Sequence, residues 1–159
     1  MPAKIGEANV VVVTGTRYPP PYDAPCLQRR RARLGDAAGL TQFGVNRLQL
    51  PPGCWSSQRH WHSAEDEFVY VLEGEVVLVT DAGEELLRAG DAAGFRAGAA
   101  NGHQLQNRSA SEAVVLEVGS RRPGEDAVDY PDIDLQIVKG QGVYAHRDGR
   151  LYDTDPPRR

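Results

Sequence analysis

Residues 58–67, with the sequence QRHWHSAEDE, contain two of the four histidines of the chain and a glutamate five residues after the second. Side chains alternate between the two faces of a strand, so His60 and His62 point the same way and Trp61 points oppositely. Glu67 begins the next predicted strand, and a short turn brings its carboxylate close to both imidazoles. His103 belongs to a later predicted strand, which closure of a barrel would bring to the same patch.

Three imidazole nitrogens and one carboxylate oxygen suit a divalent first-row metal ion with one or two coordination positions left open. Such an open site is typical of catalytic metals, whereas a structural zinc would more often use thiolates. The chain has only two cysteines, Cys26 and Cys54, and we expect both to be reduced thiols. His146 has no neighbour at ligand spacing, so we expect it not to bind metal.

Short apolar segments separated by turn residues surround these histidines. No amphipathic helix interrupts them, which favours an all-β antiparallel sandwich or barrel of the jelly-roll type. The predicted strands are 43–50, 58–62, 67–72, 75–80, 85–88, 93–96, 102–107 and 113–118.

The segments on either side of residues 42–118 differ from the predicted barrel. Residues 1–41 are expected to form an irregular arm, because Pro19, Pro20 and Pro21 exclude a central strand or a helix interior there. Within this arm, a basic cluster predicts a short helix over 26–34 that ends at Gly35. Residues 119–159 are expected to pack on the barrel or on a second subunit, and the two extensions together predict a homodimer.

Composition excludes two classes of partner. The 18 Lys and Arg residues against 22 Asp and Glu residues give a net charge of −4, without the positive excess that nucleic-acid binding requires. The longest apolar run near the start, Val10 to Val13, is too short for a signal peptide or a membrane span. We therefore expect a cytoplasmic protein that binds neither nucleic acid nor membranes.

The histidine motif and a second motif together resemble those of the cupins, a superfamily of small double-stranded β-helix barrels. The first motif is Gly53, His60-Trp61-His62, Glu67 and Gly74, and the second is Gly90, Gly98, His103 and Asn107. The resemblance implies a cupin barrel over residues 42–118. It also implies that one divalent metal ion is bound by His60, His62, Glu67 and His103.

The segments 34–40 and 144–152 are similar to a bacterial single-domain cupin subgroup described as candidate sugar-phosphate isomerases. This similarity implies that the metal, which could be Zn, Mn, Ni or Fe, acts as a Lewis acid on a small polar substrate. Strand alternation places Gln58 and Asn107 beside the ligands as candidate substrate-binding residues in an otherwise apolar lining, and no catalytic base can be assigned. An iron-dependent dioxygenase and a non-catalytic small-molecule-binding cupin are the alternatives.

Overall fold

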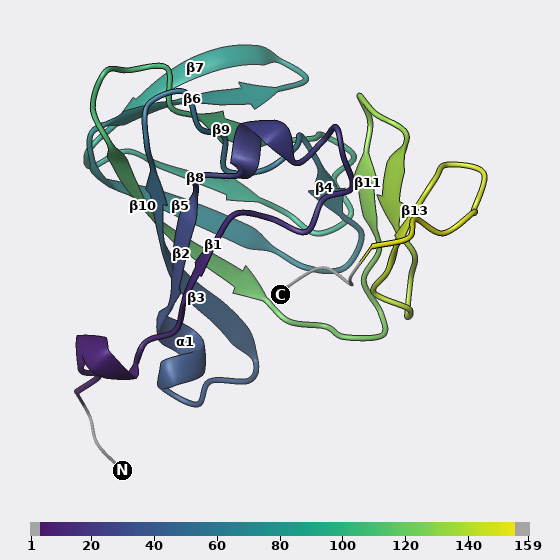
Figure 1. Ribbon diagram of the computed structural model, residues 1–159, viewed down its shortest axis with the longest axis horizontal. Coiled ribbons are helices and arrows are strands. Elements are labelled where there is room, and N and C mark those ends of the chain that lie inside the picture. The colour runs from purple at the N-terminus through teal and green to yellow at the C-terminus, as the bar shows by residue number, and fades with distance from the viewer. Residues whose placement is uncertain (1–3, 155–159) are drawn as a thin grey trace.

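Two antiparallel sheets enclose the main apolar core in the computed structural model, which describes residues 4–154 (Figure 1). The core contains Leu48, Val71 and Val115 from the larger sheet and Val76 and Leu105 from the smaller one. The larger sheet has the order β1 (Val12–Thr14), β2 (Arg30–Arg33), β3 (Phe43–Leu50), β10 (Ala113–Ser120), β5 (Glu67–Glu73) and β8 (Ala92–Phe95). The smaller sheet has the order β7 (Gly83–Arg88), β6 (Glu75–Thr80) and β9 (Gln104–Gln106).

The predicted all-β fold is therefore confirmed, and β3 and β6 have the predicted bounds. The segment predicted as a strand over 58–62 is regular only at β4 (Trp61–His62), with an isolated bridge between His60 and His103 just before it.

The inward-facing side chains of β3, β5 and β10 change from apolar to polar along the strand. On β10, Val115 is buried next to Leu48 of β3 and Val71 of β5, while Glu117 pairs in register with Asn46 and Val69. Residues paired across neighbouring strands share a face. One end of the barrel is thus closed by aliphatic packing, and the other end is a polar mouth that contains the candidate site.

The arm is more regular than the sequence predicts. The helix predicted over 26–34 is wrong, because residues 30–33 form β2, which pairs with the edge of β3 and is itself paired by β1. Pairing with β3 satisfies backbone groups that would otherwise be exposed at an edge strand. Within residues 4–41, the helical segments are the short turns η1 (Glu7–Asn9), η2 (Ala24–Cys26) and α1 (Leu34–Ala37).

The chain after the barrel folds back onto it. Strands β11 (Val128–Tyr130), β12 (Leu135–Ile137) and β13 (Tyr144–Ala145) form a third sheet with β4. Tyr18 and Cys26 of the arm join Tyr130, Leu135 and Tyr144 in a second apolar cluster. The arm and the C-terminal extension therefore pack together beside the histidine-bearing strand β4.

The proposed division into 1–41, 42–118 and 119–159 remains a prediction, and its ends, residues 1–3 and 155–159, lie outside the described residues. None of the helices among residues 4–154 is long and apolar enough to cross a membrane.

Candidate metal centre

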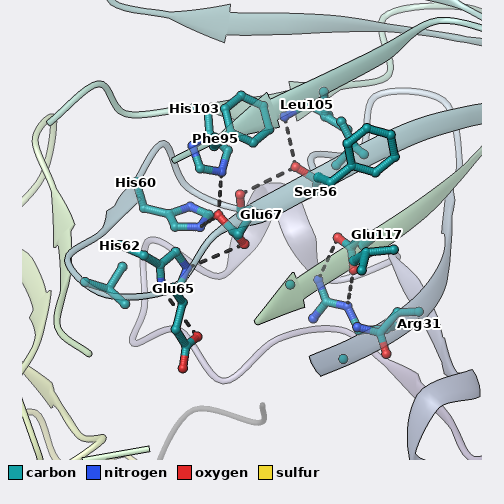
Figure 2. Close-up of a pocket in the computed structure, with 18 of the residues that line it drawn as sticks. Arg31, Ser56, His60, His62, Glu65, Glu67, Phe95, His103, Leu105 and Glu117 are labelled. Atoms are coloured by element: carbon teal, nitrogen blue, oxygen red, sulfur yellow. Dashed lines mark hydrogen bonds and ion pairs between the residues drawn. The ribbon is translucent and has the colours of Figure 1, made fainter. Parts of the chain in front are cut away.

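Three histidine rings surround the carboxylate of Glu67 at the polar mouth of the barrel (Figure 2). His60 and His103 face each other through paired backbone hydrogen bonds of 3.1 and 2.9 Å, and His62 follows in β4. Glu67 is the first residue of β5. Its carboxylate lies 2.7 Å from His103 Nε2 and 3.5 Å from the Nε2 atoms of both His60 and His62. The structure thus brings together all four residues that the sequence places in the metal site.

The outer nitrogens of two of these rings are held by acceptors. His60 Nδ1 donates to the carbonyl oxygen of Gln58 at 2.8 Å, and His62 Nδ1 lies 2.7 Å from Oδ2 of Asp126. Asp126 is only 1% exposed and also accepts a hydrogen bond from the backbone of Ala64. A histidine fixed in this way directs its Nε2 lone pair to the other side, where a metal would bind. Both Nε2 atoms accordingly face Glu67.

His103 is held by stacking. Its ring lies 3.6 Å from the ring of Phe95 with an interplanar angle of 4°, and Phe95 occupies the β8 position opposite Glu67. His103 Nδ1 is buried and has no hydrogen-bond partner among the described residues. The ring is therefore positioned by packing, with Nε2 directed at the carboxylate.

Burial and the neighbouring charges shift the protonation of the cluster. Burial would lower the pKa of His62, but its hydrogen bonds and proximity to Asp126 and Glu67 outweigh this effect and raise the pKa to about 10. Burial likewise opposes ionisation of Glu67, yet the closeness of the His103, His60 and His62 rings holds the pKa of its carboxyl well below the usual value. Burial lowers the pKa of His103, which favours the neutral form that ligates metals.

The donor set fits a divalent cation. Ligand atoms of His60, His62 and Glu67 all lie within 4.8 Å of one another, which is close enough to share one ion. Glu67 Oε2 is buried, and although it lies 2.7 Å from His103 Nε2, this contact lacks hydrogen-bond geometry. A buried carboxylate oxygen without a regular donor is well suited to a cation. Glu65 and Asp126 lie on the outer side of the His62 ring. Together with His62 they form a second group whose ligand atoms are close enough to share one ion.

A cavity of about 230 Å³ opens beside the candidate ligands. Its lining includes Arg31 of β2 and Glu117 of β10, which are joined by two contacts of 2.9 and 3.2 Å (Figure 2). Apolar side chains still make up much of the lining, as the sequence predicts, but Arg31 and Glu117 add a charged pair that the sequence analysis does not place there. Glu117 was missed, although its alternation with Val115 along a predicted strand indicates an inward-facing side chain.

The two candidate substrate-binding residues do not line this cavity. Gln58 donates its side-chain amide to the carbonyl oxygen of Tyr22, and Asn107 donates to the carbonyl oxygens of Leu50 and Ser111. Both side chains therefore brace loops, which corrects the expectation that they point beside the ligands. His146 lies apart from the cluster and contacts Asp134 and Tyr152, consistent with its exclusion from the ligand set.

Comparisons with known proteins agree with this geometry. Residues 46–119 match the family profile described as a cupin domain. A crystal structure from Silicibacter pomeroyi, described as a sugar phosphate isomerase from a cupin superfamily, is 41% identical over 96% of this chain and 98% of its own, with a TM-score of 0.87. A structure from Acidithiobacillus ferrooxidans, described as a candidate sugar phosphate isomerase, is 33% identical over 74% of each chain, with a TM-score of 0.69. No curated protein matches significantly.

Proposed function

The chain belongs to the cupin superfamily, and from its site we propose that it is a metal-dependent enzyme that interconverts the aldose and ketose forms of a small sugar phosphate. His60, His62, Glu67 and His103 would hold one divalent ion, whose identity among Zn, Mn, Ni and Fe stays open. When bound, such an ion acts as a Lewis acid that polarises a substrate carbonyl or hydroxyl oxygen. The similarity to two structures described as isomerases of this kind supports the substrate class.

The observation that carries the proposal is the carboxylate of Glu117 inside the same cavity. An aldose–ketose interconversion through an enediolate removes a proton from the carbon next to the carbonyl and returns one to the former carbonyl carbon, so this route requires a group that carries the proton. Glu65, the other carboxylate that lines the cavity besides Glu67, accepts a backbone hydrogen bond from Arg122 and lies 3.8 Å from His62. We therefore assign proton transfer to Glu117.

Arg31 gives Glu117 a fixed position. Its guanidinium contacts both carboxylate oxygens, so the side chain has little rotational freedom. Side-chain exposures of 23% for Arg31 and 21% for Glu117 leave the pair accessible from the cavity. The dioxygenase alternative is favoured by a pocket that lacks a base, so the presence of the Glu117 carboxylate supports isomerisation over oxygen chemistry.

Solvent-exchange NMR tests the proposal. Metal-loaded protein in D₂O is expected to incorporate deuterium next to the carbonyl of at least one sugar phosphate from a panel of aldose and ketose phosphates. Glu117→Gln should slow this exchange by at least about a hundredfold, because general-base catalysis typically contributes that much. The matched control is Glu112→Gln, which removes a carboxylate that pairs with Arg30 outside the cavity.

Two results would count against the proposal. Exchange that persists in Glu117→Gln at the wild-type rate would remove Glu117 from the reaction. Binding of sugar phosphates by the metal-loaded wild type without any exchange would instead support the non-catalytic binding function.

A further inference from the structure

A second cavity, of about 80 Å³, lies between the arm and β2, and we call it the arginine pocket. Four arginines line it together with Thr14, Thr16 and Tyr144, and no aspartate or glutamate of residues 4–154 does. The arginines are Arg17, Arg29, Arg31 and Arg33. Alternation along β2 directs Arg31 and Arg33 to the same face of the strand, and Arg29 precedes them at the same spacing.

Arg29 is a buried cation without a buried counter-ion. The residue is 7% exposed, and its guanidinium donates to the carbonyl oxygens of Gly15, at 3.1 Å, and Ser56. Among residues 4–154, no carboxylate lies within 4 Å of it. Removing a charge from water without an opposite charge is costly, since carbonyl dipoles compensate it only in part. The geometry therefore calls for an anion near Arg29.

The neighbouring carboxylates do not supply that anion. Glu117 pairs with Arg31 from the side of the larger cavity, and it does not line the arginine pocket. Asp36 lies 3.6 Å from Arg33 and is shared with Arg121. Within residues 4–154, the charge of Arg29 is thus not balanced by either of these carboxylates.

We propose that the arginine pocket binds a phosphate-type oxyanion, either inorganic phosphate or the phosphoryl group of a larger molecule. Guanidinium groups bind such anions through paired hydrogen bonds, which a hydroxyl-lined pocket can supplement. The cavity exceeds the roughly 10–15 Å³ that one water requires by several times, so it has room for a tetrahedral anion. Arg29, Arg31 and Tyr144 line both cavities, so the anion would sit next to the candidate metal site. This inference does not depend on the proposed isomerisation.

Isothermal titration calorimetry with inorganic phosphate tests the proposal. The wild type is expected to bind phosphate at millimolar or lower concentration, and Arg33→Gln should weaken binding at least about tenfold, the effect of losing one hydrogen bond to a charged group. Arg29→Gln should have the same or a larger effect. Because Arg29 also holds two loops, its result counts only if the circular dichroism spectrum is unchanged. The matched control is Arg30→Gln, on the opposite face of β2 and paired with Glu112, which should bind as the wild type does.

A competition experiment between phosphate and a pentose phosphate distinguishes the two sources of the anion, which are inorganic phosphate and the phosphoryl group of a larger molecule. If phosphate displaces a pentose phosphate that binds more tightly than the free pentose, the arginine pocket receives the phosphoryl end of a substrate. If both bind together, the anion is a separate ligand. Absence of phosphate binding to the wild type, or equal affinity in Arg33→Gln and Arg30→Gln, would overturn the proposal. Phosphate that is held only by a metal ion would bind Arg33→Gln and Arg30→Gln with equal affinity. Failure of the phosphate-binding proposal can therefore be distinguished from failure of the isomerase assay.

Discussion

Asp126 determines which nitrogen of His62 faces the cavity, although it lies far from His62 in the sequence. Its buried carboxylate accepts from Nδ1, which leaves Nε2 for a metal. We predict that Asp126→Asn lowers metal affinity about 10- to 100-fold, the usual cost of losing an outer partner of a ligating histidine. Competition with a coloured chelator measures this effect. Asp129→Asn is the control, because Asp129 accepts from Trp61 on the same strand and contacts none of the proposed ligands. Equal affinity in both variants would contradict this role for Asp126.

The raised pKa of His62 predicts how metal binding depends on pH. Below a pKa of about 10, the ring of metal-free protein carries the proton that a metal must displace. Metal affinity should therefore fall about tenfold for each pH unit from about pH 8 to about pH 6. In metal-free protein, the stability of the fold depends on pH in the opposite direction. The raised pKa of His62 stabilises the folded state below about pH 6.5, and this contribution is lost as the pH rises towards 10. Chelator titrations and urea unfolding at several pH values measure the two effects. A pH-independent affinity would exclude the histidines as ligands.

At the scale of elements, the turn between β5 and β6 requires glycine. Gly74 has φ of +73°, and a Cβ atom there would lie 2.8 Å from the carbonyl oxygen of Glu112. Gly53 has a similar φ of +79° but no atom within 4 Å of such a Cβ. A positive φ costs an alanine roughly 1–2 kcal/mol at either position. Gly74→Ala should therefore destabilise the protein by clearly more than Gly53→Ala in urea unfolding. Equal losses would show that the turn can move away from Glu112.

The strands were predictable wherever the inward side chains are apolar. β3 and β6 are short segments rich in Val and Leu that end next to turn residues, and their bounds follow from that pattern. In β2 the inward residues are Arg31 and Arg33, which line a polar cavity and do not pack in an aliphatic core. In the sequence they therefore look like a basic cluster and not like a strand. Hydrophobic periodicity does not detect such a strand.

Only the part of the candidate site that is formed by residues close in the sequence could be predicted. His60 and His62 share a face by spacing alone, and Glu67 follows within one turn. Asp126 reaches His62 through the β4–β11 pairing, which no local pattern indicates. Strand alternation predicts that Gln58 and Asn107 lie beside the ligands, whereas in the structure their side-chain amides donate to the carbonyl oxygens of Tyr22 and Leu50.

For the whole molecule, the homodimer stays a prediction, and we expect the outer face of β5 to form its interface. Phe68, Tyr70 and Leu72 are 43%, 38% and 43% exposed in one row on that strand. A contiguous apolar surface of this kind is typical of protein interfaces. Light scattering is expected to give twice the 17.3-kDa mass of one chain, and Tyr70→Lys should shift the protein towards monomer. A wild-type monomer at micromolar concentration would contradict the dimer.

We predict that His60, His62, Glu67 and His103 bind one divalent metal ion in a barrel that is already folded without it. The most direct test is metal analysis by mass spectrometry of wild type, Glu67→Gln and His62→Ala after equal exposure to Zn, Mn, Ni and Fe(II). We predict about one ion per chain in the wild type. Glu67→Gln, which loses the negative charge, should hold less, and His62→Ala, which loses a ligand, should hold least, while both stay folded. A wild type that retains no divalent ion would contradict the metal site. Variants that retain the full amount of metal would contradict the assignment of Glu67 and His62 as ligands.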